Sequence, residues 1–90
     1  MSLFHIGELH VKPDQKEALL ASLEILKLQA GFISNTVYES NEDKNSFTTV
    51  EEWETEQDHK NFMSSLPEDA LKQWMDILTQ PPKSSYFTKK

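Results

Sequence analysis

The sequence predicts an α+β fold in which helices cover one face of a single antiparallel sheet. Two patterns predict it. Residues 3–11, 32–40 and 46–54 are rich in residues that favour strands, and apolar stripes at helical spacing lie between and after these segments. A third observation is the length, because 90 residues suffice for one small core. We therefore interpret residues 1–90 as one domain, with residues 89–90 frayed at its end.

The first strand and the first helix form the amino-terminal third. Residues 3–11 carry apolar side chains on both faces, which is typical of a strand buried on both sides. Asp14 follows Pro13 and is predicted to start a helix, with Glu17 completing a capping-box pair. Gly31 is predicted to end this helix in the left-handed conformation that glycine adopts without steric cost.

A hairpin is predicted next. Residues 32–40 and 46–54 alternate as strands, and the polar segment Asn41-Glu42-Asp43-Lys44-Asn45 between them is typical of a turn. Asn35 places an amide where the alternation calls for an apolar side chain. In the second of these strands one face is predicted to carry Phe47, Thr49, Glu51 and Trp53.

Two helices and a closing strand complete the chain. Thr55, with Asp58 three residues later, is predicted to open a helix whose apolar stripe contains His59, Phe62, Met63 and Leu66. Pro67 suits the first turn of another helix, and residues 84–88 form a short last strand. The order β-α-β-β-α-(α)-β is the ferredoxin-like split βαβ arrangement. It leaves one sheet face uncovered, so a second copy of the chain is the simplest cover and a homodimer is expected.

Composition excludes several functional classes. The nine basic residues are all Lys, none is Arg, and the net charge is −6, which argues against nucleic-acid binding. The chain has no Cys, which excludes disulfides and thiolate metal sites. It also has no apolar run near 18 residues, so we expect no membrane span and a cytoplasmic location.

Several segments together resemble one known family. After Gly31-Phe32 come Val37-Tyr38-Glu39-Ser40, then Phe47-Thr48-Thr49-Val50-Glu51-Glu52-Trp53-Glu54, then Asp58-His59-Lys60-Asn61-Phe62. A Phe-rich strand that ends in Glu-x-Trp and is followed by His resembles the antibiotic biosynthesis monooxygenase (ABM) domain. The resemblance runs over nearly the whole chain and implies a dimeric α/β barrel.

The resemblance implies a function and the absence of a cofactor. It implies a cofactor-independent monooxygenase, an oxidoreductase, that acts on a small aromatic or quinol-like compound bound between sheet and helices. A non-catalytic dimer that binds a small apolar ligand, or acts in stress, is the alternative, favoured by the absence of Arg and of a second His after His59. Haem binding or degradation is a third function found on this fold, and the early position of His59 fits it poorly.

Three residues are the candidate catalytic groups. His59, on an apolar stripe, could serve as general base near neutral pH, and its structural role would be a hydrogen bond to a strand group. Asn35 could bond a substrate oxygen or a neighbouring side chain. Glu51 could orient His59 or accept a proton, and otherwise lies at an interface or caps a helix. The candidate substrate-binding residues, each of which could instead serve packing, are Trp53, Tyr38, Phe62 and Met63.

No metal site is predicted. His5 and His10 fall on opposite faces of the first strand, and the chain has no His-x-His or Glu-x-x-His cluster. The acidic run of five carboxylates at residues 51–58 surrounds a predicted helix start, where the helix dipole favours negative charge.

Overall fold

The computed structural model describes residues 2–90 and confirms the predicted order of elements. In chain order they are β1 (Leu3–His10), α1 (Lys16–Ser22), the 3-10 helix η1 (Leu23–Leu28), β2 (Phe32–Glu39), β3 (Ser46–Trp53), α2 (Glu56–Ser65), α3 (Glu68–Asp76) and β4 (Lys83–Phe87). Across residues 2–90, no helix combines the length and the apolar character that a membrane crossing requires.

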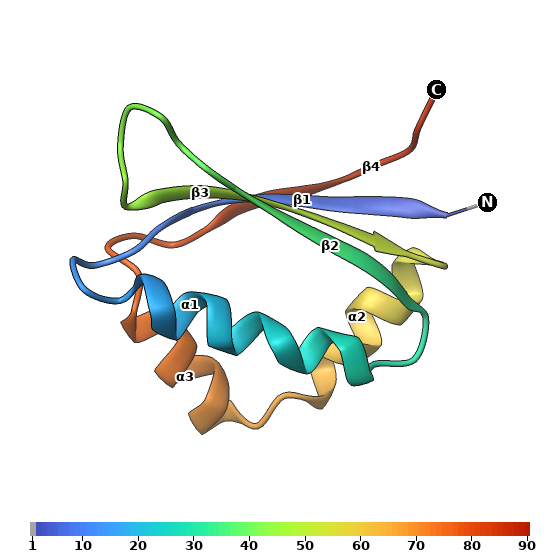
Figure 1. Ribbon diagram of the computed structural model, residues 1–90. Helices are drawn as coiled ribbons and strands as arrows, with labels where there is room; N and C mark the ends of the chain where they lie inside the picture. Colours follow the sequence, from blue (N-terminus) through green and yellow to red (C-terminus); the bar gives the residue numbers. More distant parts are fainter. Residues whose placement is uncertain (1) are drawn as a thin grey trace.

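The four strands form one antiparallel sheet in the order β2-β3-β1-β4. The first strand of the chain therefore lies between the third and the last, which is the split arrangement of a ferredoxin-like α+β fold. Figure 1 shows all the helices on one side of this sheet, below it in that view, and nothing against the other side. The helix-bearing face is therefore the face on which the chain builds its interior.

Burial along β3 follows the predicted alternation. Phe47, Thr49, Glu51 and Trp53 are all buried and face the helices. Phe47 belongs to the apolar core, which lies toward one end of the sheet and also contains Leu9, Val11, Leu19 and Leu78. Toward the other end of β3 the buried side chains are a carboxylate and an indole, so the same face changes from apolar to polar along its length.

The first helix begins later than its sequence predicts. Asp14 has a φ of 68°, outside the helical region, and α1 is preceded by Gln15, whose side chain makes no capping hydrogen bond. The predicted capping pair of Asp14 and Glu17 is therefore wrong. A backbone hydrogen bond of 3.0 Å from Gln15 N–H to the Lys12 carbonyl closes a turn here, and Asp is one of the few residues that tolerate the left-handed region this turn imposes.

A β-bulge changes which side chains of β2 face the helices. Phe32 pairs with Trp53 and Ser34 with Glu52, so Ile33 is an extra residue on this strand. Strict alternation places Phe32 opposite to Asn35, and the bulge makes that prediction wrong. Phe32, Asn35 and Val37 all pair with residues of the buried face of β3, while Ile33 is exposed.

The predicted start of α2 is confirmed. Thr55 is the N-cap, and its hydroxyl oxygen accepts a hydrogen bond of 3.1 Å from the Asp58 backbone N–H. Gly31 lies directly against Asp58 with a φ of 82°, and its carbonyl accepts a 2.8 Å hydrogen bond from the Glu54 N–H. The cap and the close approach of Gly31 together fix where α2 begins, one turn before His59.

Gly31→Ala tests this junction. An added Cβ would collide with the Asp58 carboxyl group, and the positive φ is unfavourable for alanine. We expect a loss of at least about 2 kcal/mol in the free energy of unfolding, measured by urea denaturation. Gly7→Ala is the matched control, because its Cβ would lie 3.4 Å from its nearest neighbour, the Cβ of Ser84. Equal losses for the two variants would contradict a special role for Gly31.

Candidate functional site

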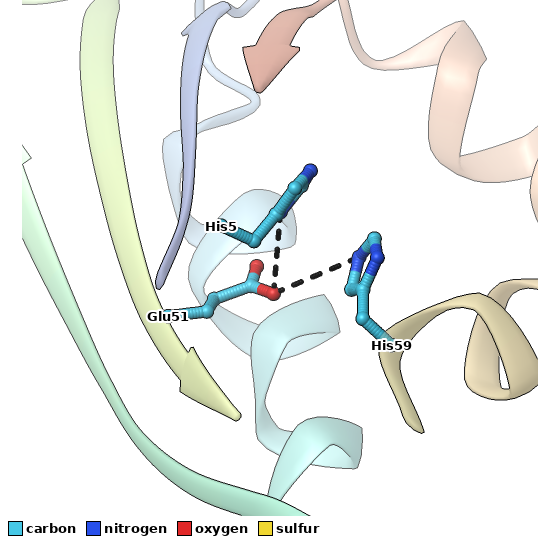
Figure 2. Close-up of side chains that lie close together, drawn as sticks. All are labelled: His5, Glu51 and His59. Atoms are coloured by element: carbon cyan, nitrogen blue, oxygen red, sulfur yellow. Dashed lines mark ion pairs between the residues drawn. The ribbon is translucent and has the colours of Figure 1, made fainter. Parts of the chain in front are cut away.

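A buried cluster of two imidazoles and one carboxylate lies under the sheet. Nδ1 of His5 is 3.5 Å and Nε2 of His59 is 4.0 Å from Oε1 of Glu51. In Figure 2, dashed lines join His5 on β1 and His59 on α2 to the same carboxylate oxygen of Glu51 on β3. The two imidazole rings stack with their centroids 4.0 Å apart.

Strand pairing and the α2 cap bring these three residues together. His5 on β1 lies directly opposite Glu51 on β3, so both side chains project from the same face. The Thr55 cap then turns the chain back under the sheet, and His59 is 5% exposed one turn into α2. The β1–β3 pairing and the Thr55 turn before α2 therefore bring His5, Glu51 and His59 together.

Neighbouring aromatic side chains hold the cluster in place. The Trp53 indole N–H donates a 3.0 Å hydrogen bond to Oε1 of Glu51, and its ring meets His59 edge-on. The Phe62 ring stacks on the Trp53 ring, with the two centroids 5.8 Å apart. The Tyr86 hydroxyl from β4 lies 2.7 Å from Nδ1 of His59. Each member of the cluster except His5 therefore has a hydrogen-bond partner that fixes its orientation.

Burial keeps the His59 imidazole neutral at physiological pH. Removal from water, and then the nearby His5, lower the pKa of His59 from 6.5 to about 4, although Glu51 acts in the opposite direction. Burial also raises the pKa of the Tyr86 hydroxyl. At neutral pH His59 is therefore an uncharged group that accepts or donates one hydrogen bond at each nitrogen.

Asn35 lies in a different part of the same face. It lines a cleft of about 540 Å³ between η1 and β2, together with Leu20, Leu23, Glu24, Lys27, Phe32, Ile33, Ser34 and Val37. Its side-chain oxygen is buried and has no hydrogen-bond partner among the described residues. Asn35 is paired with Glu51 across the sheet, and Phe32 packs edge-on against Trp53. These two residues therefore connect the cleft to the buried cluster.

The predicted site residues fall into three groups. Glu51 and His59 belong to the cluster, Trp53 and Phe62 pack around it, and Asn35 lies in the adjoining cleft wall. Tyr38 is 58% exposed and pairs with Thr48 on the face of the sheet away from the helices. Met63 is exposed on α2. The structure thus joins five of the seven residues and leaves Tyr38 and Met63 outside.

The sequence did not predict that His5 belongs to the cluster or that Tyr86 lies beside it. His5 was compared only with His10, which bonds Ser46 elsewhere on the sheet. Alternation places His5 on the same face of its strand as Leu9 and Val11, but its partner Glu51 follows only from the β1–β3 register. Tyr86 lies opposite His5 on β4, and that pairing joins the two ends of the chain.

The depressed pKa of His59 predicts a pH-dependent stability. Because the folded state binds its proton less tightly than the unfolded state, His59 stabilises the fold fully above pH 6.5, and that stability is lost as pH falls from 6.5 to 4. We expect the wild type to lose up to about 3 kcal/mol relative to His59→Asn over this window, measured by urea denaturation at each pH. His10→Asn is the control, and a wild-type to His59→Asn difference that stays constant with pH would contradict the prediction.

Comparison with solved structures supports the fold. A conserved protein from Methanosarcina mazei Go1 superposes with a TM-score of 0.81 at 19% identity, covering 100% of this chain and 94% of that one. SnoaB, a cofactor-independent oxygenase from Streptomyces nogalater, gives 0.82 at 16% identity over 99% and 93%. Rv0793 from Mycobacterium tuberculosis gives 0.77 at 20% identity over 100% and 96%. At these identities the likeness establishes the shared fold.

The family itself follows from the sequence of the chain. No match was found among curated proteins. The sequence model of the family described as antibiotic biosynthesis monooxygenase matches residues 2–77, which include β1, β2, β3 and all the helices. This match spans the cluster residues His5, Glu51 and His59 and the cleft residue Asn35. The chain therefore belongs to the antibiotic biosynthesis monooxygenase (ABM) family.

Proposed function

We propose that this protein is an ABM-type monooxygenase that oxidises a small aromatic or quinol-like compound with O₂ and without a cofactor. Family membership supports an activity of this general type, and the structural relative SnoaB is described as a cofactor-independent oxygenase. The observation that carries the proposal is the unpartnered, buried oxygen of Asn35 in the wall of a cleft large enough for such a compound.

The cleft suits a flat, mostly apolar molecule with one or two hydroxyl groups. Its volume lies within the range of roughly 300–1,000 Å³ that is typical of small-molecule sites. Leu20, Leu23, Phe32 and Val37 supply apolar walls, and Asn35 offers an acceptor for a substrate hydroxyl. A phenolic ring would therefore bury its face against the walls and donate its O–H to Oδ1 of Asn35.

Oxidation would begin with loss of this phenolic proton. The proton acceptors would be the Glu51 carboxylate, which is paired with Asn35 across the sheet, and neutral His59; both belong to the cluster beside the cleft and neither lines the cleft itself. The electron-rich phenolate carbon para to the oxygen then forms a C–O bond with O₂. Cleavage of the O–O bond leaves a carbonyl on the ring and releases the second oxygen atom as water, so that a phenol and O₂ give a quinone and H₂O.

Asn35→Ala tests the role of the cleft amide. Without it the phenolic O–H loses the acceptor that orients the substrate in the cleft, so we expect kcat/KM for a phenol or quinol to fall by roughly 10-fold in an O₂-electrode assay. Asn61→Ala is the matched control, because Asn61 is exposed on α2 and bonds only Gln57 among the described residues. His59→Asn in the same assay should lower kcat with little change in KM.

Unchanged activity in Asn35→Ala would overturn the assignment of the cleft as the substrate site.

A specific observation favours the alternative of a non-catalytic binding protein. Glu51 and Trp53 are hydrogen-bonded to each other, and His59 is hydrogen-bonded to Tyr86. None of these residues lines the described cleft, so all of them have a structural role without a substrate. Saturable binding of an aromatic compound without O₂ consumption, in the wild type and in Asn61→Ala alike, would identify that function.

We also infer that two copies of the chain pair through the uncovered sheet face. The register places Phe4, Ile6, Val50 and Phe87 on this face, and no helix lies against it in Figure 1. Tyr38 and Phe87 are exposed there. A 90-residue chain buries a small core, so a second copy would add substantial apolar burial.

Val50→Lys tests this pairing. A charge at the centre of the face is costly to bury, so the variant should shift from dimer to monomer in analytical ultracentrifugation. Ile25→Lys is the control, because Ile25 is an exposed apolar residue on the helical side of the fold. A wild type that sediments as a monomer would contradict the inference.

A further inference from the structure

The buried cluster has the composition of a metal centre. His5, Glu51 and His59 each offer one ligand atom, and these atoms all lie within 4.8 Å of one another. Two imidazole nitrogens and one carboxylate oxygen are the protein ligands of many three-ligand zinc sites, in which the fourth position stays open. We propose that this protein binds one divalent transition-metal ion of the zinc type between His5, Glu51 and His59.

The spacing is close to what such an ion requires. A tetrahedral ion with bonds of about 2.0–2.1 Å separates its ligand atoms by roughly 3.3 Å. Oε1 of Glu51 is 3.5 Å from Nδ1 of His5 and 4.0 Å from Nε2 of His59. Both contacts are longer than a hydrogen bond. The three ligand atoms lie within 4.8 Å of one another, and the His5 and His59 rings are stacked with their centroids 4.0 Å apart, so binding of an ion would require these two rings to rotate until both nitrogens face it.

Nδ1 of His5 gives an independent indication of a missing ligand. It is buried, and it has no hydrogen-bond partner within residues 2–90. It lies 3.5 Å from a carboxylate oxygen that already accepts the Trp53 N–H. A buried ring nitrogen without a partner is costly to the fold, and a cation between Nδ1 and Glu51 would satisfy it.

The surrounding hydrogen bonds have the form that metal ligands need. Nδ1 of His59 is bonded to the Tyr86 hydroxyl, which leaves Nε2 as the nitrogen that faces Glu51. The Trp53 N–H similarly fixes the orientation of the Glu51 carboxylate. Partners of this kind orient metal ligands and set the tautomer of a ligating histidine. The side chain of His5 is 16% exposed, so an ion could enter along it.

This inference shares Glu51 and His59 with the proposed oxidation, because an ion bound by them would occupy the groups that accept the substrate proton in the metal-free protein. The two proposals are nevertheless measured separately. Binding is measured without an organic substrate, and oxidation can be assayed in metal-depleted protein. Metal binding without oxidation would overturn the proposed function and leave the metal site in place. Oxidation without metal binding would overturn the metal site and leave the proposed function in place.

The test is titration of metal-depleted protein with Zn²⁺ by calorimetry and with Co²⁺ by visible spectroscopy. We expect one equivalent per chain and an intense four-coordinate Co²⁺ spectrum that Zn²⁺ abolishes. Glu51→Gln, which keeps an acceptor for the Trp53 N–H, and His59→Asn should each weaken binding by about 100-fold. His10→Asn should bind as the wild type does, because His10 bonds Ser46 outside the cluster.

Two results would overturn the metal site. One is the absence of binding heat and of a Co²⁺ band in the wild type. The other is binding that survives in both Glu51→Gln and His59→Asn, which would place the ion elsewhere. If both variants fail to fold, as judged by circular dichroism, the wild-type Co²⁺ spectrum decides, because a surface carboxylate site gives only the weak band of an octahedral ion.

Discussion

The antiparallel pairing of β1 with β3 is the constraint on which the rest of this structure depends. It sets His5 opposite Glu51 and Leu9 opposite Phe47, and so assigns one end of the sheet to a polar cluster and the other to the apolar core. A shift of β1 by one residue would turn His5 and Leu9 to the opposite face from Glu51 and Phe47. The separate pairing of β1 with β4 sets Tyr86 opposite His5, and the Tyr86 hydroxyl lies 2.7 Å from Nδ1 of His59.

Placing a carboxylate and two imidazoles in the interior of so small a fold is costly unless their polar atoms are satisfied. Trp53 and Tyr86 satisfy two of the three residues, while Nδ1 of His5 and Oδ1 of Asn35 lack partners among the described residues. Both unsatisfied atoms lie on the helix-facing side of the sheet. The fold thus keeps unused hydrogen-bonding capacity at the two places where we propose that small ligands bind.

The cleft and the cluster divide the chemistry between them. The cleft is bounded mainly by apolar side chains and the Asn35 amide, with Glu24, Lys27 and Ser34 also in its lining, which suits binding and orientation of a ring with polar substituents. The cluster concentrates the titratable groups in a dry environment, where burial holds His59 neutral. Asn35 and Phe32 lie between the cleft and the cluster. Phe32 faces the helices, as Asn35 does, because a β-bulge at Ile33 changes the alternation between them. That bulge is therefore as important to the proposed site as any of its polar residues.

The sequence by itself determined the order of the elements, the buried face of β3 and the Thr55 start of α2, because each depends on residues close together in the chain. It also singled out Glu51, Trp53 and His59, which lie within nine residues of one another. Only the tertiary structure decided that His5 and Tyr86 join them, that Phe32 faces the cleft and that Asp14 belongs to a turn. Those outcomes depend on strand register, a bulge and packing between distant segments, and alternation along one strand does not specify which residue of another strand will lie opposite.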